Sequence, residues 1–148
     1  MEESLMENME RHLKERNLQA DAFSDHNFFE LESIEPDRSV VRLVIHPENL
    51  NPYGMLHGGI LYALADDAGG SASHSTGQYY VTQSGTLHFL HNQGSGIVRA
   101  TATVRHRGSS TCLVVVDITN EDGLLLATGE LSYFCVDKAL MDQKTEES

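Results

Sequence analysis

The residues of this chain with the clearest chemical potential are His57, Gly58 and Gly59, which open a run of good helix formers. The first N–H groups of a helix have no partner within the helix, and glycine has no Cβ to keep a ligand away from them. The same end of a helix favours negative charge. The two glycines are therefore candidate hydrogen-bond donors to a ligand at the start of a helix.

A carboxylate, Asp66, follows nine residues after His57. It belongs to a stripe of otherwise small residues that recur at intervals of three and four: Gly59, Ala63, Asp66, Gly70 and Ser73. Such a stripe allows another backbone to approach closely, or leaves room for a ligand. Asp66 is thus a candidate functional carboxylate, and the alternative is a solvated or hydrogen-bonded helix residue. Asp67 points about 100° away.

The spacing of these two features has a consequence for quaternary structure. Gly58 and Asp66 are separated by eight residues, or roughly 12 Å of helix rise. A carbon held about 3 Å from the N–H donors is out of reach of Asp66 on the same helix. A second, antiparallel copy of the helix could bring its own Asp66 there. The sequence predicts a symmetric dimer with two composite sites.

The surrounding elements are predicted to be strands. Six segments have strand character: 28–34, 39–45, 78–90, 96–107, 110–119 and 124–136. The segment 110–119 is apolar on both faces and should be a central strand. We expect an α+β fold, with a six-stranded, largely antiparallel sheet wrapped around one long central helix. Residues 1–24 should form an N-terminal helical segment, 25–137 the domain, and 138–148 a frayed acidic tail.

Composition narrows the function classes. A net charge of −12 over 148 residues argues against nucleic acid as a partner. Apolar runs are too short to span a membrane, and the N-terminus lacks a signal-peptide pattern. We interpret Cys112 and Cys135 as free buried thiols of a cytoplasmic protein. The histidines show no ligand-like cluster, so no metal or other cofactor is expected.

Carboxylates are missing between Ala68 and Val116, although the chain is acidic. Buried strands avoid Asp and Glu, which explains most of this gap. Burial does not explain Arg105 and Arg107 within the gap, and these two cations could mark where an anionic ligand approaches.

The arrangement of Asn51, His57-Gly58-Gly59 and Asp66 resembles the PaaI-like branch of the hot-dog-fold thioesterases. The resemblance extends over residues 28–136 and includes the pattern Thr82-x-x-Gly-x-Leu-x-Phe-Leu. It implies a hot-dog fold and hydrolysis of an aryl- or medium-chain acyl-CoA thioester. It also implies a homodimer, with dimers pairing into tetramers.

The resemblance further implies roles for individual residues. The N–H of Gly58 would bind the thioester carbonyl, and Asn51 would assist at that carbonyl or position water. Asp66 of the partner subunit would act as base or nucleophile, and Thr82 would orient water. His57 would support the loop or the thioester sulfur. Three further residues are candidates for substrate binding. Gly59 lies at the helix start, and Arg105 and Arg107 would bind the phosphates of coenzyme A.

The sequence departs from the family pattern at two places, and two alternative functions remain. Leu90-His91-Asn92 stands where many relatives have Arg-Pro, and Gly69-Gly70 interrupts the helix with flexible residues. The alternatives to hydrolysis are a hot-dog hydratase or dehydratase and a non-catalytic acyl-CoA-binding module. A serine hydrolase is disfavoured because the chain has no Gly-x-Ser-x-Gly motif.

Overall fold

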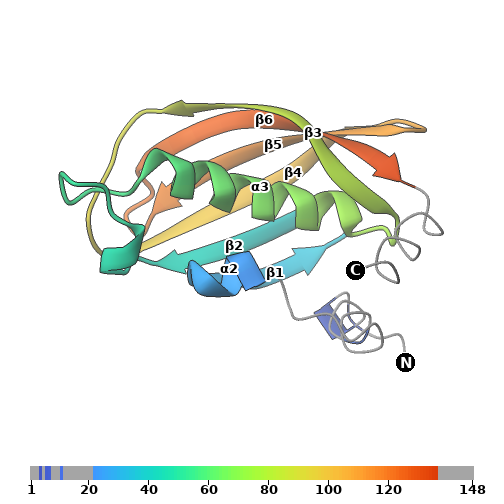
Figure 1. The fold of residues 1–148 in the computed structure, drawn as a ribbon. Coiled ribbons are helices and arrows are strands. Elements are labelled where there is room, and N and C mark those ends of the chain that lie inside the picture. The colour runs from blue at the N-terminus through green and yellow to red at the C-terminus, as the bar shows by residue number, and fades with distance from the viewer. Residues whose placement is uncertain (1–3, 5, 8–10, 12–21, 137–148) are drawn as a thin grey trace.

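A computed structural model describes Ser4, Met6, Glu7, Arg11 and residues 22–136 (Figure 1). The predicted helical segment over residues 1–24 lies largely outside the described residues, and the predicted tail over 138–148 lies wholly outside them. The described elements are α2 (Ala22–His26), β1 (Phe29–Glu35), β2 (Arg38–Val44), a 3₁₀ turn η1 (Pro47–Asn49), α3 (Gly58–His74), β3 (Tyr79–Phe89), β4 (Ile97–Arg107), β5 (Thr111–Asn120) and β6 (Leu125–Val136).

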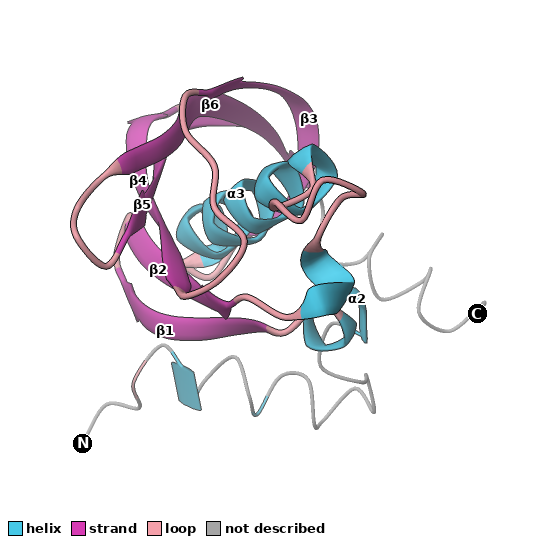
Figure 2. Ribbon diagram, turned by 90° about the vertical axis from the view of Figure 1, so that its left-hand side faces the viewer, coloured by secondary structure: helices cyan, strands magenta, loops and turns pink. Residues whose placement is uncertain are grey.

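The six strands form one antiparallel sheet in the order β1-β2-β4-β5-β6-β3. Figure 2, turned by 90°, shows this sheet curving around α3 from β1 through β4 and β5 to β3. The prediction of a six-stranded antiparallel sheet wrapped around one long helix is confirmed. The strand β5 lies inside the sheet between β4 and β6, as its apolar sequence predicted.

The core lies between α3 and the concave face of the sheet. Alternate residues of β5, namely Cys112, Val114, Val116 and Ile118, are completely buried, as period-two strand geometry requires. The helix contributes Leu61, Leu64, Ala65, Ala68 and Ala72, each no more than 1% exposed. This apolar face of the central helix therefore packs on the sheet.

The strand β3 forms one edge of the sheet. Among the described residues, β3 pairs with β6 alone, so one edge of this 11-residue strand has no backbone partner. Thr82 lies on β3 and is exposed.

No helix in the described part of the chain is long and apolar enough to cross a membrane.

Candidate active site

The start of α3 exposes one backbone donor rather than two. His57 is the N-cap, and its Nδ1 accepts a hydrogen bond of 2.9 Å from the N–H of Gly59. The expectation that both glycine N–H groups are bare is therefore wrong for Gly59, because the cap residue satisfies the second N–H of the helix. The N–H of Gly58 has no acceptor among the described residues, and Gly58 is exposed.

Asn51 folds the loop that precedes the helix. Its Oδ1 accepts hydrogen bonds from the N–H groups of Tyr53 and Met55, at 2.9 and 3.2 Å. Its backbone N–H donates to the carbonyl of Met55 at 2.7 Å. The side-chain oxygen of Asn51 is thus committed to the loop. Its Nδ2 donates to no described residue and remains available to a ligand.

Asn92 holds the backbone immediately before the cap. Its Oδ1 accepts from the N–H of Leu56 at 3.1 Å, and its Nδ2 donates to the carbonyl of Leu56 at 2.9 Å. The N–H of His57 is bound by the carbonyl of Asn49 at 3.0 Å. Sequence reasoning noticed Asn92 only as a departure from the family pattern. Its role depends on a contact across 36 residues that no local signal reveals.

Apolar side chains flank the free Gly58 N–H. The ring of Phe89 lies 3.8 Å from the position that a Cβ on Gly58 would take. Phe89 is 53% exposed, and its neighbour Leu90 is 52% exposed. Tyr53 and Met55, in the loop before the helix, are exposed as well. This end of α3 therefore offers a polar donor beside apolar surface.

Asp66 lies in a second cluster, eight residues further along the helix. Its Oδ1 accepts hydrogen bonds from Thr82 Oγ1 at 2.8 Å and from the Tyr133 hydroxyl at 2.9 Å. The Tyr133 hydroxyl also lies 3.1 Å from the Asp66 carbonyl oxygen. Oδ2 accepts no hydrogen bond from a described residue. The structure thus brings Asp66 and Thr82 together within one chain and adds Tyr133, which sequence reasoning missed.

Tyr133 is a donor at every physiological pH. The side chain is 1% exposed, and burial raises the pKa of its phenol well above the ordinary value, with the negative charge of Asp66 raising it further. A phenol that keeps its proton donates its one hydrogen, here toward the carboxylate and carbonyl oxygens of Asp66.

The two clusters remain apart within one chain. The helix is continuous from Gly58 to His74, so Gly58 and Asp66 are separated by about 12 Å along its axis. His57, Gly58 and Gly59 lie at the N-terminal end of α3, and Asn51 lies in the loop that precedes it. Asp66 lies further along α3, where Thr82 of β3 is hydrogen-bonded to it.

Arg107 lies at the opposite end of α3 from Gly58. Its five N–H groups are taken by the carboxylate of Asp37, the carbonyls of Ala72 and Ser73 and the hydroxyl of Tyr80. A guanidinium has five N–H donors, so none remains for a phosphate. Within this chain Arg107 caps the last carbonyls of the helix, and we do not keep it as a ligand for coenzyme A. Arg105 is exposed and pairs with no described residue.

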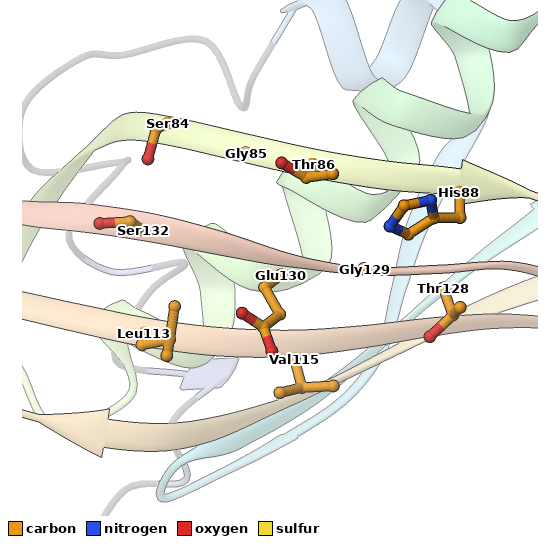
Figure 3. A pocket seen from close by; sticks show the side chains of 10 residues that line it. All are labelled: Ser84, Gly85, Thr86, His88, Leu113, Val115, Thr128, Gly129, Glu130 and Ser132. Carbon is orange, nitrogen blue, oxygen red and sulfur yellow. The ribbon is translucent and has the colours of Figure 1, made fainter.

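A hollow of about 530 Å³ lies on the outer face of the sheet (Figure 3). Its lining comes from β3, β5 and β6: Ser84, Gly85, Thr86, His88, Leu113, Val115, Thr128, Gly129, Glu130 and Ser132. It contains none of the candidate catalytic residues, which lie on the side of α3. It is therefore not the candidate active site. Among the described residues, no group of three or more His, Cys, Asp or Glu side chains could hold a metal.

A six-stranded antiparallel sheet wrapped around one helix defines the hot-dog fold, and solved structures support this assignment. The PaaI protein of the Escherichia coli phenylacetic acid degradation operon superposes with a TM-score of 0.81 at 25% identity, over 90% of this chain and 94% of that one. A mutant of the phenylacetic acid degradation protein PaaI from Thermus thermophilus gives 0.74 at 29% identity, over 78% and 100%.

Sequence comparison identifies the family. The model of the thioesterase superfamily matches residues 53–127, which is half of the chain, and the chain belongs to this superfamily. The acyl-coenzyme A thioesterase PaaI of Escherichia coli is 34% identical over 90 residues, which cover 60% of this chain and 64% of PaaI, slightly under two thirds of its length. The 1,4-dihydroxy-2-naphthoyl-CoA hydrolase of Listeria monocytogenes is 32% identical over 66% of this chain and 81% of that protein. The family resemblance predicted from sequence is confirmed.

Proposed function

We propose that this protein hydrolyses an acyl-CoA thioester with an aryl or medium-chain acyl group to the free acid and coenzyme A. The observation that carries the proposal is the half-buried carboxylate of Asp66 on α3, which accepts hydrogen bonds from Thr82 and Tyr133. The same helix begins with the open N–H of Gly58. The names of the two curated relatives, an acyl-CoA thioesterase and a CoA hydrolase, support the substrate class.

The proposed site is composite. One subunit supplies Gly58, and Asp66 of the partner subunit completes the site, because about 12 Å separates the two residues along one helix. The open edge of β3 supports this arrangement, since an unpaired strand edge can pair with a second copy. The exposed or half-buried small residues Gly59, Ala63 and Gly70 would let a second helix approach. Pairing of such dimers into tetramers is part of the proposal.

The proposed chemistry uses one donor and one carboxylate. The thioester carbonyl oxygen accepts the Gly58 N–H, which stabilises the negative charge that develops on it. Oδ2 of the partner's Asp66 either removes a proton from the attacking water or attacks the carbonyl carbon itself. Collapse of the tetrahedral intermediate breaks the C–S bond and releases the thiolate of coenzyme A. In the first route the partner's Asp66 returns the proton taken from water to this thiolate, and the acid is free. In the second route the acyl group remains on the partner's Asp66 as a mixed anhydride, which a water hydrolyses to the free acid and the restored carboxylate, and the remaining proton goes to the thiolate. Thr82 donates its hydrogen to Asp66, so its oxygen lone pairs remain available to orient a water.

Thiol release from a panel of aromatic and aliphatic acyl-CoAs tests the proposal. Asp66→Ala should lower kcat at least ~100-fold, because it removes the group that activates water. Equal release by Asp66→Ala and wild type would contradict the mechanism. Absence of release on every substrate would contradict the function, and hydration of crotonyl-CoA would favour a hydratase instead.

Two further proposals concern the binding of coenzyme A and the cellular location, and each rests on one observation. Arg105 is the cation that we propose for the coenzyme A phosphates, because it is exposed and unpaired among the described residues. We propose a cytoplasmic location, which the two free cysteines, Cys112 and Cys135, support.

A further inference from the structure

The carboxylate of Asp66 is held asymmetrically. Two hydroxyl groups, those of Thr82 and Tyr133, donate to Oδ1, and no described residue donates to Oδ2. Rotation of the carboxylate about its Cβ–Cγ bond would break both hydrogen bonds. The arrangement therefore distinguishes two oxygens that are equivalent in a free aspartate.

The sheet register places the two hydroxyls side by side. Thr82 of β3 and Tyr133 of β6 are direct partners across the antiparallel pair, and β3 bulges immediately afterwards, between Thr82 and Ser84. A bulge shifts the register and re-aims side chains, and such bulges are frequent next to active sites. Asp66 on α3 receives both hydrogen bonds from this one point of the sheet.

Gly69 leaves the space through which the hydroxyl of Tyr133 reaches the carboxylate of Asp66. A Cβ on Gly69 would lie 2.2 Å from the hydroxyl oxygen of Tyr133, far inside contact distance. Any other residue at this position would displace the Tyr133 hydroxyl or the helix. The glycine three residues after Asp66, which looked like a departure at the sequence level, is therefore part of the same arrangement.

We infer that Tyr133 is a positioning residue for the reaction: with Thr82 it fixes Oδ1 of Asp66 and leaves Oδ2 as the oxygen that reacts. This inference rests on the proposed function. A buried phenol with a satisfied hydrogen bond could also be purely structural, and the two roles differ in what the loss of the hydroxyl changes. A structural role affects stability, whereas a positioning role affects kcat at an unchanged KM.

The test compares Tyr133→Phe with Tyr80→Phe, using the acyl-CoA that wild type hydrolyses fastest. Tyr80 is a matched control, because it is also buried (5% exposed) and its hydroxyl is hydrogen-bonded, to Gln78 and Arg107, at the far end of α3. We expect Tyr133→Phe to lower kcat about tenfold or more with KM within about twofold, since a hydrogen bond to a charged group is lost. Tyr80→Phe should lower Tm without changing kcat.

A double variant sharpens the comparison. In an Asp66→Ala background, Tyr133→Phe should cause no further loss of kcat, because a residue that acts through Asp66 has nothing left to position. A further tenfold loss in that background would overturn the inference. Wild-type kcat in Tyr133→Phe, alongside an inactive Asp66→Ala, would overturn it as well while leaving the proposed function intact. A wild-type protein inactive on every acyl-CoA would instead refute the proposed function, and the inference with it.

Thr82→Val covers the case in which Tyr133→Phe does not fold, because Thr82 is exposed on β3 and valine has nearly the same shape. It removes the other hydroxyl that donates to Oδ1. We expect kcat of this variant to fall with KM within about twofold. Wild-type kcat in Thr82→Val would overturn the inference.

Discussion

At the scale of single residues, the histidine of the His-Gly-Gly motif acts on its own helix. The Nδ1 of His57 accepts the Gly59 N–H, which fixes the first turn of α3 and leaves the neighbouring Gly58 N–H as the open donor. At the proposed site a ligand oxygen would therefore meet one defined backbone donor, the N–H of Gly58. The imidazole is exposed and contributes by holding the helix start in place.

This reading of His57 predicts a separable effect on stability. His57→Ala should lower the free energy of unfolding by about 1 kcal/mol, and His57→Asn should recover most of the loss because asparagine is a good N-cap. Denaturant unfolding measures both. If His57 also acts on the thioester sulfur, His57→Asn would combine near-normal stability with a reduced kcat.

Residues of the site differ in how far the sequence could predict them. We predicted the candidate residues Gly58 and Asp66 from their types and spacing, and Asn51 from the family resemblance. Tyr133 and Asn92 were not predicted, because their roles depend on contacts across 67 and 36 residues. The capture of the Gly59 N–H by His57 is local, and the N-cap preference for a side-chain acceptor could have revealed it.

At the scale of elements, the two ends of α3 are in opposite states. The N-terminal end has an open donor beside the exposed side chain of Phe89. The C-terminal end is closed by Arg107, which binds the carbonyls of Ala72 and Ser73. Asp37 accepts from the same guanidinium and ties the β1–β2 turn to the helix. One end is thus fixed to the fold, and the other is available to a ligand.

The arginines of β4 should therefore behave differently on substitution. Arg107→Ala should lower the free energy of unfolding by roughly 2–3 kcal/mol, because several charge-assisted hydrogen bonds are lost. Arg105→Ala should leave stability unchanged and raise KM for acyl-CoA, since an exposed cation near a phosphate contributes to binding. Thermal unfolding and steady-state kinetics measure the two effects. An unchanged KM in Arg105→Ala would remove this residue from the proposed site.

The elements themselves followed closely from the sequence. The expected strands end within a few residues of the observed ones, because period-two patterns and turns such as Asp122-Gly123 mark them locally. The role of Arg107 could not be read in this way. Its partners come from the β1–β2 turn, the end of α3 and β3, and only the folded sheet brings them together.

At the scale of the whole molecule, the proposed composite site predicts how mixed dimers behave. Gly58→Pro removes the open N–H, and proline is tolerated as the first residue of a helix. The preceding His57 already has the extended conformation (φ −65°, ψ 134°) that proline requires of its neighbour. This substitution therefore removes the proposed donor with little expected effect on the helix.

Gly58→Pro and Asp66→Ala should each be inactive alone and should recover activity when their subunits are exchanged. A mixed dimer contains one site in which both Gly58 and Asp66 are intact and one site in which both are substituted. Random exchange should therefore restore up to about a quarter of wild-type activity. Thiol release before and after reversible unfolding of the mixture measures it. A mixture that remains inactive, with dimers intact, would show that the site does not lie between subunits.

The unbroken helix between Gly58 and Asp66 has a thermodynamic consequence. If the thioester touches one chain through Gly58 and the other through Asp66, substrate binding and subunit association are linked equilibria. The dimer then binds the thioester more tightly than the monomer, and the thioester tightens the dimer by the same factor. The separation of Gly58 and Asp66 along one helix would thereby link the concentration of substrate to the assembly of the proposed dimer.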